Sequence, residues 1–194
     1  ECLLLEYAEE AKLYLPVENI ELLSKYGHEE GLLDRLGGGA WQAKKAKLKE
    51  RMETLIVGDP MDKNTDIGAI NSKMQLEKIE SYLDIGRQEG GEMYQSSCRV
   101  PAKGYWCRPT LFTGVSQSNR VVQEEIFGPV LAIQTFRRFD EAITKANNTP
   151  YGLSGGVWTD KGAKIFKMTQ SLRAGVVWAN TFNKFDPASP FGGY

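Results

Sequence analysis

The sequence has few of the residues that most often carry chemistry. Its 194 residues include one histidine, His28, and three cysteines, Cys2, Cys98 and Cys107. Residues 27–30 lack the His-Glu-x-x-His spacing of a helical zinc site. The cysteines are odd in number and form no Cys-x-x-Cys pair, which argues against a disulfide framework and a zinc knuckle and leaves a Cys98–Cys107 bridge open. We therefore expect no metal site.

An excess of charge of one sign and long apolar runs are also absent. Lys and Arg total 24 and Asp and Glu total 25, so no global positive field exists to hold a phosphate backbone. No apolar run approaches the roughly 18 residues that a membrane helix needs, and the first residues do not have the pattern of a secretion signal. We expect no nucleic-acid partner, no membrane span and a cytoplasmic location, with a mitochondrial origin of a longer parent chain left open.

Two motifs that bind nucleotide phosphates are missing. No glycine loop leads into Gly-Lys-Ser/Thr, and Gly37-Gly38-Gly39 is not followed by the third glycine of a dinucleotide-binding fingerprint. The sequence therefore does not predict a P-loop protein or a stand-alone Rossmann domain.

Charge is unevenly distributed along the chain. Residues 1–40 carry nine acids and three bases, a net of 3 − 9 = −6, whereas residues 41–52 carry five bases and one acid, a net of +4. The triple glycine at 37–39 lies between these blocks and is typical of a hinge. We predict an acidic N-terminal extension over residues 1–43, with two short amphipathic helices, and a second domain over residues 44–194.

Helices and strands alternate in the second domain. Strands rich in branched and aromatic residues are predicted at 111–115, 130–136, 154–158 and 176–180. Helices are predicted at 44–57, from a Ser72 cap to Gly86 and Gly90, from 139 or 140 (with Asp140 as the cap) to 147, and at 160–172. Strands joined by helices of this length predict an α/β fold with a mostly parallel sheet and helices on both faces.

Two loops combine residues suited to binding. Residues 123–129 place two acids and an aromatic in a predicted strand-to-strand turn closed by Gly-Pro. Neighbouring carboxylates at extended positions point opposite ways, so one can face a cleft and accept both hydroxyls of a ribose. A polar turn with a packing Phe is the alternative. Residues 185–194 form either a surface connection or a binding wall lined by Phe185 and Phe191.

Four blocks of this sequence, in order, resemble the aldehyde dehydrogenase superfamily. They are Glu124–Val130, Ala146–Leu153, Ala174–Asn180 and Ser189–Tyr194, with further similarity at residues 57–60 and 104–112. The resemblance covers about residues 44–194. It implies the C-terminal part of that family's catalytic domain, which uses NAD or NADP to oxidise small-molecule aldehydes and forms oligomers.

The resemblance also implies roles for individual residues. Glu125 corresponds to the acid that holds the nicotinamide ribose, and Phe127 to the aromatic that touches the nicotinamide region. Gln75 and Lys78 correspond to contacts on the cofactor side, and Phe191 to an aromatic that lines the aldehyde tunnel.

The catalytic groups of the family are not found here. Its cysteine nucleophile lies in a Gly-Gln-x-Cys block ahead of the matched region, and residues 24–30 do not resemble that block. None of the three cysteines is predicted to be the nucleophile, and the glycine-rich cofactor domain and general-base glutamate are not recognised. We therefore predict no catalytic residue, and a fragment of an aldehyde dehydrogenase that is inactive alone. The alternative is a catalytically dead regulatory or protein-binding module in which residues 1–40 dock on a partner.

Overall fold

The computed structural model describes residues 39–194. These residues divide into two units, 39–134 and 135–194. The two helices predicted within the N-terminal extension lie outside the described residues. No helix within residues 39–194 is long and apolar enough to span a membrane.

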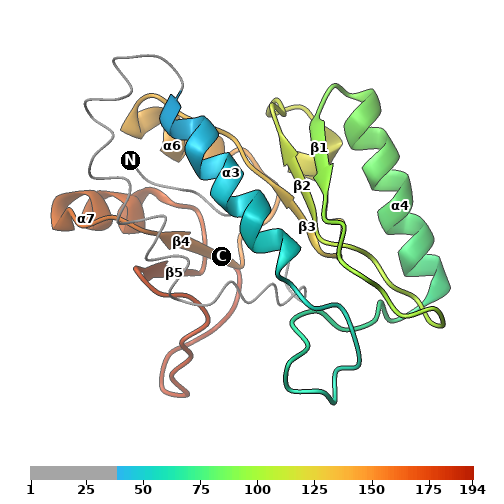
Figure 1. Ribbon diagram of the computed structural model, residues 1–194. Helices are drawn as coiled ribbons and strands as arrows, with labels where there is room; N and C mark the ends of the chain where they lie inside the picture. Colours follow the sequence, from blue (N-terminus) through green and yellow to red (C-terminus); the bar gives the residue numbers. More distant parts are fainter. Residues whose placement is uncertain (1–38) are drawn as a thin grey trace. The chain divides into compact units, whose positions relative to one another are not determined.

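The unit of residues 39–134 contains a three-stranded sheet (Figure 1). Its strands are β1 (Glu92–Gln95), β2 (Thr110–Thr113) and β3 (Val130–Ala132), in that order across the sheet. β1 runs antiparallel to β2, with Glu92 opposite Thr113, and β2 runs parallel to β3, with Thr110 opposite Val130. The helices are α3 (Gly39–Glu53), α4 (Lys73–Gln88) and α5 (Arg120–Gln123).

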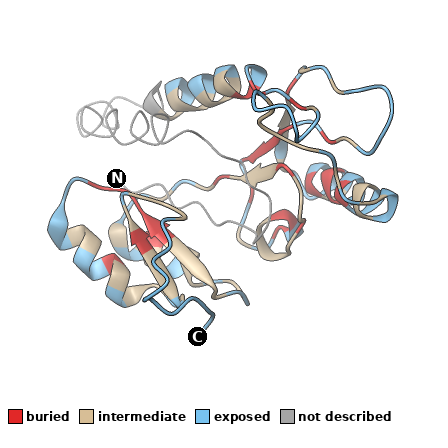
Figure 2. Cartoon of the chain, turned by 90° about the horizontal axis from the view of Figure 1, so that it is seen from below, coloured by how far each residue is buried: buried red, intermediate tan, exposed pale blue. Residues whose placement is uncertain are grey.

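Helices α3 and α4 pack on opposite faces of this sheet. All four residues of β2 are buried (Figure 2), and successive side chains of a strand alternate between its faces. Leu111 packs with Met52 of α3 in one apolar cluster, whereas Phe112 packs with Ile79 of α4 in another. The predicted arrangement of helices on both faces of a sheet is therefore confirmed for this unit.

Polar contacts also fasten α3 to β1 and the residues after it. Lys45 pairs with Glu92 at 2.8 Å, and the Lys49 ammonium lies 4.6 Å from the centre of the Tyr94 ring. Glu53 accepts hydrogen bonds from the Tyr94 hydroxyl and from the backbone and hydroxyl of Ser97. The hydrogen bond to Glu53 raises the pKa of Tyr94 to about 12. These three helix positions are four residues apart and so share one side of α3.

Helix α3 differs from its predicted bounds at both ends. It begins at Gly39, so the last of the three glycines is helical, and it ends at Glu53 rather than at Val57. Val57 instead makes a parallel bridge to Ile67, and the Ile56 amide donates to the Asp66 carboxylate at 2.8 Å. The backbone from Ile56 onward is therefore engaged by the following loop and cannot continue the helix.

Helix α4 confirms the predicted start and corrects the predicted end. The Ser72 hydroxyl accepts from the Gln75 amide at 3.1 Å, as an N-cap should. Gly86 does not close the helix, which runs on to Gln88. A Cβ built on Gly86 would lie 2.6 Å from the Phe112 ring and 2.8 Å from Val121. Gly86 therefore serves close packing, and only Gly90, with φ of 87°, belongs to the helix end.

The unit of residues 135–194 holds two parallel strands and two helices. β4 (Ser154–Val157) pairs with β5 (Val176–Ala179), with Ser154 opposite Val176. The helices are α6 (Phe139–Ala146) and α7 (Gly162–Ser171). Its apolar cluster contains the fully buried Val157 and Met168, and partly buried residues of α6, α7 and β5 pack against these two.

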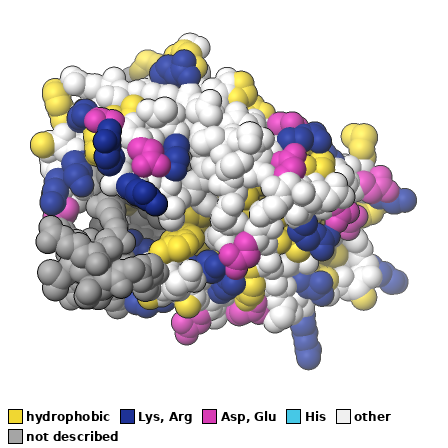
Figure 3. All heavy atoms as spheres, turned by 90° about the horizontal axis from the view of Figure 1, so that it is seen from above, with side chains coloured by type: hydrophobic (Ala, Val, Ile, Leu, Met, Phe, Trp, Pro, Cys, Tyr) yellow, Lys and Arg dark blue, Asp and Glu magenta, His cyan; other side chains and the backbone are white. Residues whose placement is uncertain are grey.

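Asp140 is not the cap of α6, contrary to the prediction. The N-cap is Arg138, whose side chain makes no capping bond, and Asp140 lies in the first turn, where it pairs with Lys167 at 2.8 Å. The α/β class itself is confirmed, and two of the three strand pairings among residues 39–194 are parallel. On the face drawn in Figure 3, acidic and basic side chains are interspersed.

Candidate functional site

The acidic segment follows a helix rather than a strand. Sequence analysis placed residues 123–129 in a strand-to-strand turn, but Gln123 is the last residue of α5 and Val130 begins β3. The prediction missed α5 because four residues are too few for a periodic apolar pattern. Glu124 itself is extended, with φ of −120° and ψ of 146°, and its amide donates to the Arg120 carbonyl at 2.9 Å.

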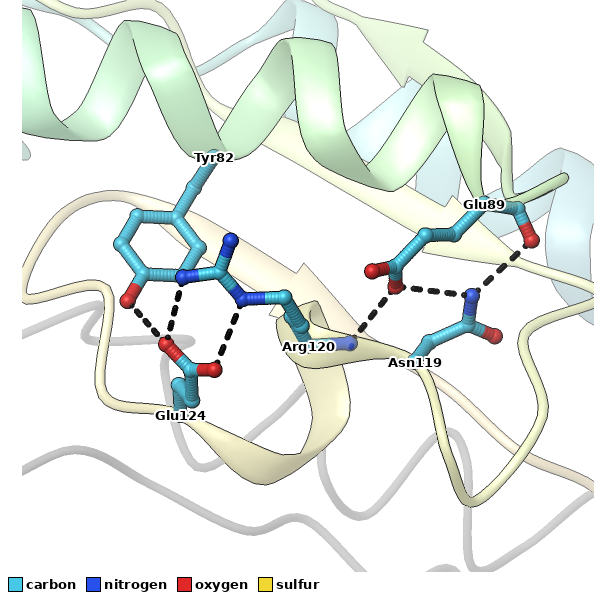
Figure 4. A network of polar contacts seen from close by, with 5 residues as sticks. All are labelled: Tyr82, Glu89, Asn119, Arg120 and Glu124. Carbon is cyan, nitrogen blue, oxygen red and sulfur yellow. Dashed lines mark hydrogen bonds and ion pairs between the residues drawn. The ribbon is translucent and has the colours of Figure 1, made fainter.

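The Glu124 carboxylate is held by two side chains (Figure 4). Arg120 donates to it from Nε at 2.7 Å and from Nη2 at 3.0 Å, and the Tyr82 hydroxyl donates at 2.5 Å. The Arg120 guanidinium also lies 5.4 Å from the centre of the Tyr82 ring. The hydrogen bonds from Arg120 and then Tyr82 lower the pKa of Glu124 to about 2, and the bond to Glu124 raises the pKa of Tyr82. The Glu124 carboxylate is therefore an anionic acceptor that two side chains hold in place.

A second group of contacts fixes the start of α5 (Figure 4). Glu89, at the end of α4, accepts from the Arg120 amide at 2.7 Å and from the Asn119 side chain at 3.2 Å. The same Asn119 amide group also donates to the Glu89 carbonyl at 3.0 Å, and Asn119 is buried. The last turn of α4 therefore holds the first residue of α5.

Phe127 has a backbone conformation that side chains seldom adopt. Its φ is 58°, in the left-handed region, which costs a bulky residue about 1–2 kcal/mol. The Gln75 side-chain amide donates to the carbonyls of Ile126 at 2.9 Å and Phe127 at 3.1 Å. The next residue, Gly128, has no room for a Cβ, which would lie 2.6 Å from Ile79. Contacts from α4 therefore maintain this turn.

Three residues of α4 and its C-cap hold the segment from Asn119 to Phe127. They are Gln75, Tyr82 and Glu89, which are seven residues apart in sequence. Seven residues turn an α-helix to within about 20° of two full turns, so these residues share one face. That face contacts the segment at its start, its middle and its end.

Four of the five predicted binding residues lie in the unit of residues 39–134. Glu125 and Phe127 are half-buried in the segment just described, and Gln75 contacts its backbone. Lys78 is exposed, with its ammonium 5.9 Å from the centre of the Tyr82 ring. Glu125, Phe127 and Gln75 are therefore brought together, and their roles in cofactor binding stay predictions.

Phe191, the fifth predicted binding residue, belongs to an aromatic cluster of the unit 135–194. Its ring centre lies 4.9 Å from that of Phe185 and 6.3 Å from that of Trp178. Trp178 also contacts Phe182 at 4.9 Å and is 8% exposed, whereas Phe185 and Phe191 are 57% and 48% exposed. Phe185 and Phe191 thus expose apolar surface, and both rings pack on the buried Trp178.

The two cysteines among the described residues are free thiols. Cys107 is buried, and burial raises the pKa of its thiol to about 11, so it stays protonated near neutral pH. Cys98 is a half-buried free thiol, and Cys2 lies outside the described residues. Within residues 39–194 no group of three or more His, Cys, Asp or Glu side chains is placed to hold a metal ion.

One further pattern was not singled out from the sequence. Residues 152–156 read Gly-Leu-Ser-Gly-Gly, which fits the Gly-x-Ser-x-Gly form of a hydrolase elbow. That elbow requires the serine at a turn from a strand into a helix, but Ser154 is the first residue of β4. The single histidine of the sequence, His28, lies outside the described residues. The pattern therefore does not indicate a hydrolase.

Sequence reasoning did not single out Tyr82, Glu89, Asn119 and Arg120 as site residues. The separation of four residues between Arg120 and Glu124 was a usable signal, because such pairs meet on one side of a helix. The contact of Tyr82 with Glu124 joins residues 42 apart, and no local pattern indicates it.

Comparison with solved structures shows the fold of this chain in complete proteins. An NAD-dependent aldehyde dehydrogenase from Sinorhizobium meliloti matches with a TM-score of 0.75 and 36% identity, over 79% of this chain and 31% of that chain. A betaine aldehyde dehydrogenase from Staphylococcus aureus, solved with NAD+, matches with a TM-score of 0.74 and 33% identity, over the same shares.

Curated relatives give the same result. Acetaldehyde dehydrogenase 2 of Cupriavidus necator is 43% identical over 150 residues, which are 75% of this chain and 29% of the relative. Aldehyde dehydrogenase B of Escherichia coli is 43% identical over 150 residues, with shares of 74% and 29%. This chain therefore spans less than a third of the length of these relatives.

Two family models match the chain. Residues 1–27 match one described as the CarD-like/TRCF RID domain. Residues 38–194 match the aldehyde dehydrogenase family, and the chain belongs to that family.

Proposed function

We propose that residues 44–194 form the C-terminal part of the catalytic domain of an NAD(P)-dependent aldehyde dehydrogenase, in which Glu125 binds the nicotinamide ribose. One observation carries this proposal. Glu124 is extended and its carboxylate is held by Arg120 and Tyr82, so the side chain of the next residue leaves on the other side of the backbone. In this proposal Glu124 orients the segment and Glu125 faces the cofactor.

The chemistry of the segment fits the nicotinamide half of the cofactor. A carboxylate can accept from both hydroxyls of a ribose through charge-assisted bonds, and an aromatic ring such as Phe127 can pack against the nicotinamide. The cofactor, when bound, supplies a hydride acceptor. The residues of this chain bind and orient it, with Gln75 acting through the backbone of Phe127 and Lys78 near the same side of α4. Similarity to an NAD-dependent aldehyde dehydrogenase and to a betaine aldehyde dehydrogenase solved with NAD+ favours NAD over NADP.

The aldehyde lies, in this proposal, against the aromatic surface formed by Phe185 and Phe191. Their exposed rings suit a small apolar carbonyl compound, because ring faces contribute burial without demanding hydrogen bonds. The nucleophile and general base come from the part of the family domain that this chain does not match. The chain alone is therefore inactive in this proposal, and the complete enzyme is a cytoplasmic oligomer.

A graft tests the assignment of Glu125. Residues 38–194 replace the matching segment of Escherichia coli aldehyde dehydrogenase B, and the graft is assayed with NAD and an aldehyde. Glu125→Gln should lower kcat/KM for NAD by roughly ten- to a hundredfold, equivalent to about 1.5–3 kcal/mol, because an amide offers one acceptor oxygen and turns a donor toward the other hydroxyl.

Glu124→Gln is the matched control, since it makes the same change one position away. It should cost less than Glu125→Gln, and no more than about the three- to tenfold expected for Arg120→Gln, because its amide oxygen can still accept from Arg120 or Tyr82. If Glu124→Gln is the more damaging, or if both changes are silent, the assignment of Glu125 is wrong.

The match of residues 1–27 to a second family model favours a second candidate function. In it, the acidic N-terminal extension binds a partner protein with a basic surface, and the aldehyde dehydrogenase part has no catalytic role. The graft separates the two candidates, because it lacks residues 1–37. An inactive graft that folds like the parent enzyme would favour the binding module.

A further inference from the structure

The direction of Glu125 and Phe127 depends on contacts that these residues do not make themselves. Three donors bind the Glu124 carboxylate: Nε and Nη2 of Arg120 and the hydroxyl of Tyr82. Glu124 is extended and directly precedes Glu125, so fixing Glu124 also restrains the backbone from which Glu125 projects. A rotation of the backbone at this point would turn both side chains together.

The segment beyond Glu125 also requires external support. A phenylalanine in the left-handed region persists only where its surroundings determine it, and such strain clusters at functional sites. At the turn itself, Gln75 donates to the carbonyls of Ile126 and Phe127. Three residues earlier, Arg120 and Tyr82 hold the Glu124 carboxylate. Two side chains of α4, Gln75 and Tyr82, therefore attach this segment, one at the strained turn and one just before it.

We propose that Tyr82 and Arg120 are positioning residues, which hold Glu124 so that Glu125 and Phe127 face the nicotinamide half of the cofactor. This inference rests on the proposed function, because it assigns a purpose to the direction of Glu125. Tyr82 and Arg120 touch neither cofactor nor aldehyde. They act through Glu124.

The geometry of Arg120 distinguishes positioning from simple charge balance. Its Nε and Nη2 donate to separate oxygens of Glu124, a two-point contact that fixes the plane of the carboxylate. A lysine would supply the same charge with no such fork. Arg120→Lys should therefore recover only part of what Arg120→Gln loses.

The first experiment uses the full 194-residue chain without ligand. Nitrogen-15 NMR gives the backbone order parameter at Phe127 and the hydrogen-exchange rate of the Glu124 amide, which donates to Arg120. The order parameter at Phe127 should fall from about 0.85 toward 0.6 in Arg120→Gln. Exchange at Glu124 should rise about three- to tenfold, and Tyr82→Phe, which removes one hydroxyl from the contact, should show a smaller change of the same kind.

Arg87→Gln is the matched control. Arg87 forms an exposed ion pair with Asp84 on the same helix, so this variant removes an arginine and its partner contact without touching the segment. Both readouts should be unchanged. Equal order parameters in Arg120→Gln and in the unaltered chain would overturn the inference, whatever the outcome for Glu125.

The second readout is kinetic and uses the graft defined above. Arg120→Gln and Tyr82→Phe should raise KM for NAD about three- to tenfold and leave KM for the aldehyde unchanged, and Arg120→Lys should fall between Arg120→Gln and the parent. If Arg120 and Tyr82 had a purely structural role, these variants would not raise KM for NAD more than KM for the aldehyde. That result would overturn the inference even if Glu125→Gln is damaging. If instead Glu125→Gln is silent while Phe127 loosens in Arg120→Gln, the proposed function fails and the positioning of the turn stands as a structural fact.

Discussion

Replacing Gly86 by alanine tests how closely α4 approaches the sheet and α5. In an exposed helix interior this change is favourable by about 1 kcal/mol, because glycine has the greater backbone freedom to lose. Here the added methyl would lie 2.6 Å from two atoms of the Phe112 ring and 2.8 Å from Val121. Both neighbours are buried, Phe112 completely, so neither can move into solvent.

The expected result is a net loss of stability. Overpacking of a closed core costs roughly 1–3 kcal/mol, and contact with a ring that cannot withdraw belongs at the upper end of that range. Subtracting the propensity gain of about 1 kcal/mol leaves a net destabilisation of about 2 kcal/mol. Amide hydrogen exchange at β2 measures it within the unit of residues 39–134, as a rise in exchange rate of about thirtyfold.

Two further variants test whether the loss of stability in Gly86→Ala comes from contact with the Phe112 ring. Ser81→Ala, on the exposed side of the same helix, should change stability by only a few tenths of a kcal/mol. Phe112→Leu removes the ring atoms that the new methyl would meet, so the double variant should be less destabilised than the sum of the single ones by about 1 kcal/mol or more. A gain of about 1 kcal/mol in Gly86→Ala alone would refute the close approach.

Three other predictions follow from single contacts. Ser72→Ala removes the hydroxyl that accepts from the Gln75 amide, and it should destabilise α4 by about 1 kcal/mol, measured by amide exchange in its first turn. Cys107 should react with iodoacetamide much more slowly than Cys98 at pH 8 and faster as pH approaches about 11, because burial keeps its thiol protonated; peptide mass spectrometry gives both rates. Lys145 lowers the pKa of Glu141 from 4.5 to about 2, so this pair stabilises α6 above about pH 4.5 and ceases to do so as pH falls toward 2; Lys145→Gln should remove that part of the acid dependence followed by circular dichroism, and identical acid profiles would contradict it.

Most helices and strands were predictable from the sequence, and two short ones, β1 and α5, were not. The cap at Ser72 indicated α4, and segments rich in branched and aromatic residues indicated the positions of β2 to β5. Strand β1 was missed because its four residues are mostly polar and only partly buried, and α5 because it completes a single turn. Both are maintained by neighbours distant in sequence rather than by their own pattern.

Gly86 shows why the helix end was misplaced. A glycine near the end of a periodic segment indicates either a C-cap with positive φ or a close approach of two elements. The sequence contains both kinds, at Gly90 and Gly86, and no local feature separates them. What separates them is Phe112, 26 residues further along, whose position depends on the folded sheet.

The residues of the candidate segment lie close together in the sequence, so the sequence could single them out. The acid pair, the following aromatic and the Gly-Pro closure indicated that residues 123–129 form either a binding segment or a polar turn, and their role in binding stays a prediction. The spacing of Arg120 and Glu124 could have indicated that Arg120 holds the first acid of the pair. The contact of Tyr82 with the same carboxylate could not be predicted, because Tyr82 belongs to another helix, 42 residues earlier.

The division of roles that we propose for the two adjacent acids has a physical basis. A single glutamate could not both fix its own backbone and bind a ribose, because the bonds that fix it would occupy the same oxygens. In this segment one carboxylate is saturated by an arginine fork and a tyrosine hydroxyl, and the left-handed turn after it is maintained by a glutamine on the same helix. Helix α4 packs on the sheet, where its Ile79 is buried in one cluster with Phe112 of β2. The contacts from α4 therefore attach the segment to the rigid core. Orientation of a ligand to within a fraction of an ångström requires such support, since a side chain is placed no better than the backbone that carries it.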